Sequence, residues 1–388
     1  MNAMFSKRFH WDMRPNRLAE TLARKRQHGA PILDLTESNP TRAGLAYPAE
    51  IVEAFADPRI LLYDPVPAGA EEARRAVAHY YAAHGETISP ERVLLTASTS
   101  EAYAYLFKLL ADPGGEVLVP RPSYPLFEFL ADMESVAARQ YPLVYHGGWA
   151  IDLEALQEAV TERTRAIVLV NPNNPTGSYV KRAELEVLVK LSAARRIPLI
   201  ADEVFADYAL GADDERVATL VGVEGCLAFS MSGLSKVAGL PQMKLGWVVA
   251  SGPEQLREEA LRKLEWIADT YLSVSTPVQC AAARLLDAGA AVARQIRERT
   301  AANLAWARDA LAGSAASILA VEGGWYCTVQ MPRIRSEEEW ALELLERCGV
   351  LVQPGYFYDF ETEAFLVVSL LTEPTTLREG ITRLREMM

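Results

Sequence analysis

Several features are scarce in this 388-residue sequence, and each scarcity excludes a class of protein. The four cysteines, Cys226, Cys280, Cys327 and Cys348, lie far apart with no C-x-x-C pair, so neither a disulfide framework nor a cysteine zinc site is indicated. A reducing, cytoplasmic compartment fits this usage best. The five histidines never fall at metal-ligand spacing, and we therefore expect no metal.

Basic residues are fewer than acidic ones, 39 against 51. The formal net charge is −12, and no dense run of lysine and arginine occurs, which argues against a nucleic-acid or anionic-membrane partner. No apolar run approaches the roughly 18 residues of a membrane span. Residues 1–15 lack the apolar core of a signal peptide. With half of its residues hydrophobic, the chain is instead typical of a globular protein with two packed domains.

Short apolar runs alternate with helical patterns between residues 93 and 250. These runs, bounded by proline, glycine or charged turns, are RVLLTA, EVLVP, RAIVLV, IPLIAD, CLAFS and LGWVVA. Near-continuous apolar strands are typical of a sheet covered on both faces, so the pattern predicts an α/β fold with a mostly parallel, doubly wound sheet. Long helices and then shorter elements follow, which predicts a smaller α+β domain. We place the large domain at residues 46–280 and the small domain at 1–45 and 281–388.

Polar groups follow two of the predicted strands. Asp202 ends the apolar run IPLIAD, and the turn 171–177 follows the preceding strand. Open α/β sheets bind ligands at this edge, where a carboxylate can keep a pyridine nitrogen protonated. The Asn174 amide can reach the same ligand. For Asp202 the alternative is a cap, and for residues 171–177 it is a plain turn, because Asn, Pro and Gly are the usual turn residues.

A lysine follows a further strand, in the motif Ser232-Gly-Leu-Ser-Lys236. Lys236 lies among small and apolar residues, and partial burial lowers the pKa of an ammonium toward the nucleophilic amine that forms imines. A surface lysine is the alternative. Ser235 and Lys244 are candidates for contact with a phosphate.

The segment Thr96 to Ala102 predicts the beginning of a helix after a strand. The free N–H groups of a helix N-terminus, together with its partial positive charge, can bind a phosphate. An ordinary N-cap at Ser98 or Thr99 remains the alternative.

In their joint order these segments resemble the class I and II aminotransferases, which are pyridoxal 5′-phosphate (PLP) enzymes of fold type I. The resemblance extends from about residue 34 to residue 371. Its motifs are Tyr63 to Gly69 with Arg74, Thr96 to Ala102, Pro122 to Pro125, Asn171 to Gly177, Ala201 to Val204, Ser235-Lys236, Gly323 to Tyr326 and Gln353 to Gly355.

The resemblance implies a role for each matching residue. Lys236 would carry PLP as a Schiff base and move the proton between the substrate Cα and the cofactor. Asp202 would pair with the pyridinium, Asn174 with the ring hydroxyl, and Tyr124 would stack on the ring. The implied phosphate-binding residues are Ser98, Thr99, Ser100, Ser235 and Lys244.

The same resemblance implies the reaction and the assembly. Tyr63 would reach the phosphate of the neighbouring subunit, which implies a homodimer with shared active sites. The reaction implied is transamination between an amino acid and a 2-oxo acid. Lyase or biosynthetic chemistry of the β-elimination type remains open, because the same fold and residues support it.

Three positions depart from the family pattern. Phe205 stands where D-E-V-Y supplies a tyrosine hydroxyl, and Tyr208 is a candidate to replace that hydroxyl. Lys244 stands where an arginine usually forks onto the phosphate, so it keeps the charge without the bidentate geometry. Val367 replaces the arginine that binds the substrate carboxylate. The segment Ser38-Asn-Pro-Thr-Arg42 resembles the one lining the family's active-site mouth, so Asn39 and Arg42 are our candidate substrate-binding residues.

Overall fold

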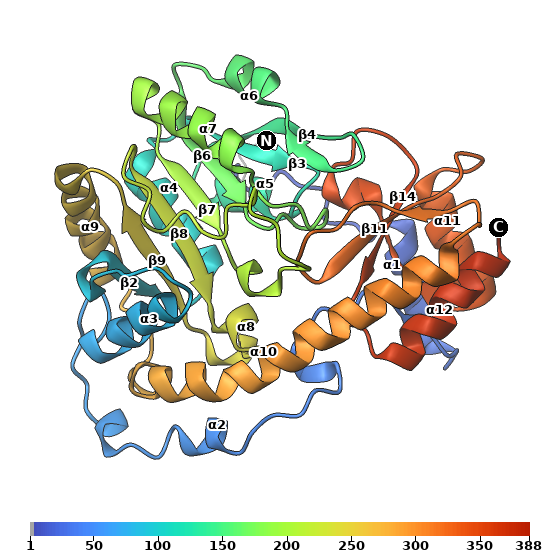
Figure 1. Cartoon of the computed structure of the whole chain (residues 1–388), viewed down its shortest axis with the longest axis horizontal. Coiled ribbons are helices and arrows are strands. Elements are labelled where there is room, and N and C mark those ends of the chain that lie inside the picture. The colour runs from blue at the N-terminus through green and yellow to red at the C-terminus, as the bar shows by residue number, and fades with distance from the viewer. Residues whose placement is uncertain (1–3) are drawn as a thin grey trace.

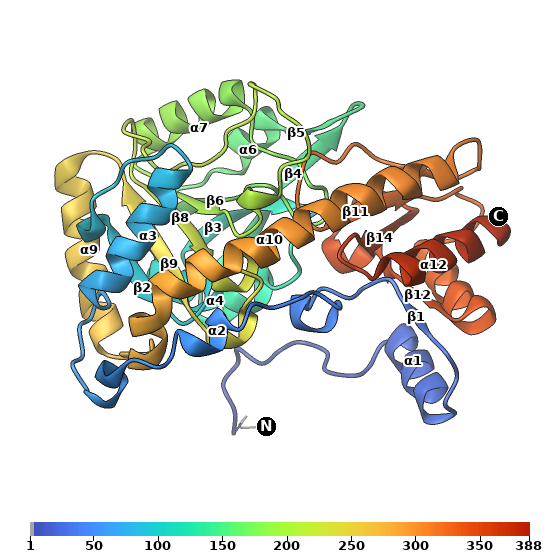
Figure 2. The same cartoon turned by 60° about the horizontal axis from the view of Figure 1, so that its bottom comes forward.

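The computed structural model describes residues 4–388 and shows a large and a small structural unit joined by one long helix, α10 (Thr276–Leu311) (Figure 1). Turned as in Figure 2, α10 runs obliquely across the molecule, and the short helix α2 (Glu50–Glu53) lies against it. No helix within residues 4–388 combines the length and the apolarity needed to cross a membrane.

An eight-stranded sheet forms the centre of the large unit. Strands β3, β4, β6, β7 and β8 pair in parallel, whereas β9 runs antiparallel between β2 and β8, and β5 is antiparallel to β4 at the other edge. The predicted mostly parallel sheet is confirmed. In spatial order the strands are β2 (Val93–Thr96), β9 (Gly246–Ser251), β8 (Ala228–Gly233), β7 (Leu199–Asp202), β6 (Thr164–Val170), β3 (Glu116–Arg121), β4 (Ala137–Tyr145) and β5 (Trp149–Ile151).

Both faces of this sheet are buried under helices. On β3, Val117 and Val119 pack in one cluster with α4, α5 and α9, whereas Leu118 between them packs in another with α6 and α7. Successive side chains of a strand point to opposite faces, so a sheet covered on both faces needs apolar residues at every position. The helices are α3 (Glu71–Ala83), α4 (Thr99–Leu110), α5 (Phe127–Met133), α6 (Leu153–Ala159), α7 (Arg182–Arg195), α8 (Leu234–Val237) and α9 (Glu254–Asp269).

The small unit contains an antiparallel sheet of four strands in the order β10, β11, β14, β13. Cys327 and Val368 on one face of this sheet join a core with α12, whereas Tyr326 on the opposite face packs against the core of the large unit. The elements are α1 (Arg17–Gln27), β1 (Leu33–Asp34), β10 (Ser317–Ile318), β11 (Tyr326–Gln330), α11 (Glu337–Glu343) with a π-helical turn (Leu344–Cys348), β12 (Val350–Leu351), β13 (Gln353–Pro354), β14 (Phe365–Ser369) and α12 (Pro374–Glu386).

The division into domains at residues 45 and 280 stays a prediction. Helix α10 begins at Thr276 and continues without interruption through that boundary.

Candidate active site

The carboxyl ends of three neighbouring parallel strands bring the predicted residues to one edge of the large sheet. Asp202 is the last residue of β7, the turn 171–177 follows β6, and α8 with Lys236 follows β8. The Asn171 amide donates to the Asp202 carbonyl at 2.8 Å, which ties two of these strand ends together. This is the edge at which open α/β sheets bind their ligands.

Lys236 points into an aromatic environment. Its Nζ lies 4.8 Å from the ring centroid of Trp325 and 5.6 Å from that of Phe205. Burial lowers the pKa of Lys236 to about 8, although the negative charge of Asp202 opposes the shift. Roughly a tenth of such an amine is neutral at pH 7. Lys236 is therefore a partly buried, nucleophilic amine rather than a surface lysine.

Asp202 is a buried carboxylate with few partners of its own. It is 7% exposed and accepts hydrogen bonds from the Tyr103 hydroxyl at 3.1 Å and the Val204 amide at 3.2 Å. Burial raises the pKa of Asp202 to about 6, while the Val204 amide, the Tyr103 hydroxyl and the charge of Lys236 lower it. A carboxylate held this way gains stability from any further cation, such as a protonated ring nitrogen.

The next residue, Glu203, has a different role. Its carboxylate accepts from the Thr219 hydroxyl at 2.6 Å and the Leu220 amide at 2.7 Å, and it is almost fully buried. Burial raises its pKa to about 7. These local donors make Glu203 a structural link between the end of β7 and the loop at 219–220, so Asp202 is the acid available to a ligand.

The N-terminus of α4 closes one side of the site. Ser98 is the N-cap, and its Oγ accepts from the Glu101 amide at 3.2 Å, so the capping alternative holds for this side chain. The backbone N–H groups of Thr99 and Ser100 belong to the first turn, where a phosphate can bind. A Cβ added to Gly246 would lie 3.1 Å from the Ser98 carbonyl carbon, a tight contact, so glycine favours the close approach of β9 to the helix end.

Within residues 4–388, three buried polar atoms at this edge lack hydrogen-bond partners, one of them the Trp325 indole nitrogen. Asn174 is 8% exposed, and neither its Oδ1 nor the Ser232 hydroxyl is hydrogen-bonded within the described part of the chain. The Asn174 side chain carries an NH2 group beside this oxygen, so it can donate as well as accept. Buried polar groups normally have partners, and unpartnered ones in a cleft indicate a ligand. Ser232 belongs to the lysine motif, but no feature of the sequence marks its hydroxyl as part of the site.

The other predicted residues surround this edge. Tyr124 is partly buried, and burial, with a contribution from the Asp202 charge, raises its pKa to about 12. Ser235 is partly buried within α8, and Lys244 is exposed in a left-handed conformation with φ of 54°.

Tyr63 is 79% exposed, so in a single chain its ring faces outward. A buried acid at Asp202, an amide at Asn174, the N-terminus of α4 and the amine of Lys236 are groups that suit the ring nitrogen, ring hydroxyl, phosphate and aldehyde of PLP.

The structure settles what surrounds Phe205. The ring is buried, with its centroid 5.3 Å from Trp325 and 6.1 Å from Tyr326. Tyr208 does not replace the missing hydroxyl, because its own hydroxyl donates to the main-chain carbonyl of Lys236 at 2.5 Å. The suggestion that Tyr208 serves the cofactor is therefore wrong, and the side chain instead holds the lysine backbone.

Val367 is fully buried in β14, where it pairs with Thr328 and Gln353. Paired residues of neighbouring antiparallel strands share a face, so this part of the small sheet presents uncharged side chains to the large unit. The structure brings the segment 37–42 beside it, because the Ser369 hydroxyl donates to the Glu37 carbonyl at 2.6 Å.

Asn39 and Arg42 occupy a short turn at the end of this segment. The Asn39 Oδ1 accepts from the Thr41 amide at 3.0 Å and the Thr41 hydroxyl at 2.7 Å, so this oxygen caps the turn. Arg42 is exposed on the same turn. The segment thus lies beside β14, and within residues 4–388 the Arg42 side chain makes no hydrogen bond or ion pair.

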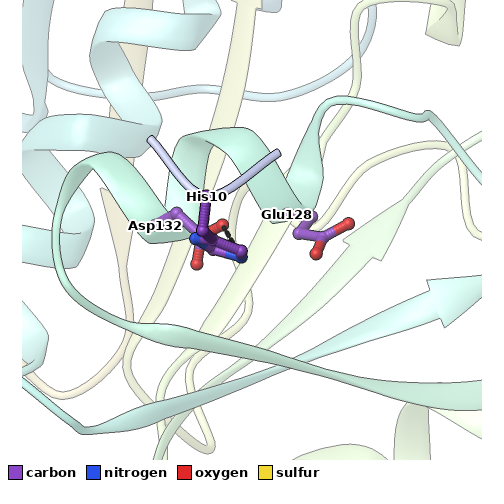
Figure 3. A group of neighbouring side chains, drawn as sticks. All are labelled: His10, Glu128 and Asp132. Carbon is purple, nitrogen blue, oxygen red and sulfur yellow. Dashed lines mark ion pairs between the residues drawn. The ribbon is translucent and has the colours of Figure 1, made fainter. Parts of the chain in front are cut away.

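One group of possible metal ligands occurs within residues 4–388, and it lies at the surface (Figure 3). His10 of the N-terminal segment approaches Asp132 of α5 at 3.6 Å, and Glu128 stands one turn away along the same helix. The Asp132 Oδ2 also accepts from the Trp11 indole at 2.7 Å. An ion pair and a hydrogen bond that hold the N-terminal segment on α5 account for this group. Histidine spacing did not indicate it, because its members are far apart in sequence.

Comparison with known proteins identifies the relatives of this chain. A family model described as aminotransferase class I and II matches residues 30–384. Glutamate-pyruvate aminotransferase AlaA of Escherichia coli is 28% identical over 267 residues, which cover 66% of this chain and 64% of AlaA, less than two thirds of that protein. An S-alkyl-thiohydroximate lyase of Arabidopsis thaliana is 30% identical over 223 residues, covering 57% of this chain and 48% of the lyase. A solved variant of the Thermus thermophilus aspartate aminotransferase is 25% identical, covers 99% of both chains and has a TM-score of 0.85.

Proposed function

The chain belongs to the class I and II aminotransferases, and from that premise we propose that it uses PLP to transfer an amino group between an amino acid and a 2-oxo acid. The observation that carries this proposal is that a partly buried lysine, Lys236, and a buried carboxylate, Asp202, lie at the same ligand-binding edge of the sheet. Each charge shifts the pKa of the other, so the two groups share one site.

Bound PLP supplies a protonated pyridine ring that takes up electrons from a bond to the substrate Cα. The chain's residues prepare this chemistry. Asp202 holds the proton on the ring nitrogen, and the Asn174 amide fixes the ring hydroxyl. Tyr124 covers the ring face. The Lys236 amine, whose pKa is lowered to about 8 by burial, accepts and returns the proton at Cα, a task for which a pKa near the working pH is best.

The phosphate is assigned to the N-terminus of α4, with the amides of Ser98, Thr99 and Ser100, and to Ser235 and Lys244. The exposed Tyr63 is assigned to the phosphate of a second copy of the chain, so the proposed assembly is a homodimer with shared sites. The exposure of its ring in the single chain supports this assignment. The cytoplasmic location also stays a prediction.

The test begins with the purified protein and added PLP. The expected results are a visible absorbance band and a borohydride-trapped adduct at Lys236, identified by peptide mass spectrometry. A colourless protein without such an adduct would refute the proposal.

Lyase chemistry is a second candidate, because one relative of this chain is a lyase. Incubation with single amino acids, without a 2-oxo acid, separates the two. Conversion of the bound PLP to its amine form, once per site, is expected for transamination. Ammonia released over many turnovers would favour elimination instead.

Arg42 provides the first mutational prediction. We propose that Arg42, with Asn39, binds the substrate carboxylate in place of the family arginine at Val367. A charge-assisted hydrogen bond contributes on the order of 1.5–3 kcal/mol, so Arg42→Ala is expected to raise KM by roughly tenfold to a hundredfold with little change in kcat. Steady-state kinetics on an accepted amino acid measure this. Arg26→Ala, an exposed arginine on α1, is the matched control, and an unchanged KM for Arg42→Ala would remove Arg42 from the site.

A further inference from the structure

The segment that leads into β11 is fixed tightly against the large unit. Lys181 Nζ donates to both carboxylate oxygens of Glu322, at 2.6 and 2.5 Å, and the Tyr179 amide donates to one of them at 2.7 Å. A Cβ added to Gly323 would lie 2.8 Å from the Tyr179 ring and 2.9 Å from the Tyr208 carbonyl. Only glycine permits this approach, so the backbone at Gly323 is held against the large unit and fixes where Trp325, two residues later, lies.

This segment delivers Trp325 to the reactive lysine. Trp325 is fully buried, and its ring packs edge-on against Phe205 at 5.3 Å and Tyr208 at 5.1 Å. The Lys236 Nζ lies 4.8 Å from the indole centroid, within the range of a cation–π interaction. Tyr208 packs against this indole and donates its hydroxyl to the Lys236 carbonyl, so one side chain links Trp325 to the lysine backbone.

Two opposing effects act on the charge at this nitrogen. Burial removes water from the ammonium and favours the neutral amine. The negative face of an indole attracts a cation, most strongly when water is excluded, and tryptophan is the strongest of the aromatic side chains in this respect. With phenylalanine at position 205, no phenolic hydroxyl is present there, and both rings nearest to Nζ act through their π electrons.

We propose that Trp325 is a positioning residue for Lys236, and that its indole face stabilises positive charge on the lysine nitrogen and on the cofactor linkage that this nitrogen forms. The inference rests on the proposed function, in which Lys236 is the reactive amine. It adds a residue that changes the stability of positive charge on the Lys236 amine through its π electrons, without exchanging a proton with that amine.

Fluorinated tryptophans placed at position 325 by nonsense suppression test the electrostatic part without changing the shape of the side chain. Each fluorine withdraws electron density from the ring face. Across a series from one to four fluorines, the pKa of Lys236 in the PLP-free protein is expected to fall stepwise, by a total of about 0.5 to 1.5 units. The readout is the pH dependence of Lys236 acetylation by acetic anhydride, measured by peptide mass spectrometry.

Trp340 is the matched control position. Trp340 is equally buried, and the Arg335 guanidinium lies over its ring at 4.6 Å from the centroid. It belongs to α11 in the small unit. The same fluorinated series at position 340 is expected to leave the pKa of Lys236 unchanged. A flat pKa across the position-325 series, or equal shifts from both positions, would overturn the inference.

A second measurement keeps this inference separate from the proposed function. In the PLP-bound protein, the midpoint of the pH titration of the visible band is expected to shift downward in the same order across the series, and Trp325→Phe is expected to fall between the native and the most fluorinated protein. Absence of the band from every form, with the acetylation shift present, would defeat the proposed function alone. A band whose midpoint never moves would defeat the role of Trp325.

Discussion

Lys236→Ala is expected to lower kcat for transamination by at least about a thousandfold and to abolish the borohydride-trapped adduct. A positioned general base contributes roughly a hundredfold to ten-thousandfold, and the lysine also provides the nucleophile that binds the cofactor. The partly buried amine, with its pKa lowered to about 8 by burial, is suited to both tasks. Because Asp202, Asn174 and the α4 N-terminus are positioned by other elements of the fold, the variant is expected to retain PLP noncovalently.

Single-turnover kinetics with an accepted amino acid measure the loss, and equilibrium dialysis measures the retained PLP. Lys263→Ala is the matched control, because Lys263 lies exposed on α9 and pairs only with Glu259 in the described chain. Added methylamine is expected to restore part of the rate to Lys236→Ala, since a small amine can occupy the vacated space. Activity within tenfold of the native protein would contradict the assignment of Lys236.

The large sheet was predictable because its strands obey a simple rule. Val117, Leu118 and Val119 alternate between two buried faces, so the sequence reads as a continuous apolar run. Strands β4 and β5 are not continuously apolar. Strand β4, which lies next to the edge strand β5, carries Arg139, Gln140 and Pro142 at incompletely buried positions, and such a sequence gives no clear strand pattern.

The candidate site was predictable to the extent that it follows strand ends. Asp202, Asn174 and Lys236 each come directly after an apolar run, and parallel strands bring such residues to one edge. Tyr103 and Trp325 reach the same edge from a helix and from the small unit, and their positions depend on tertiary packing. Sequence spacing also could not show that the Tyr208 hydroxyl turns to the Lys236 carbonyl, because that direction is set by the helical turn at 206–208.

Asp202→Asn is expected to have opposite effects on activity and on the stability of the PLP-free protein. Transfer activity should fall by about a hundredfold to a thousandfold, because a preorganised charge beside the ring is lost. Stability without PLP should rise near pH 8. Burial raises the pKa of Asp202 from 3.8 to about 6, so the folded state binds the proton more tightly than the unfolded state. Its favourable contribution is complete below about pH 4 and is lost as the pH rises through about 6.

A shift of this size corresponds to roughly 3 kcal/mol at pH 8, and asparagine removes the charge that causes it. Urea unfolding of the PLP-free proteins at pH 4.5 and pH 8 is expected to show a difference between variant and native protein that grows with pH. Asp214→Asn, an exposed carboxylate, should show no such growth. Added PLP should reverse the order at pH 8, because a protonated ring nitrogen gives the Asp202 carboxylate a cationic partner in addition to Lys236. Equal pH dependence in all three proteins would show that the charge at 202 is solvated, and the pairing with the ring nitrogen would lose its physical basis.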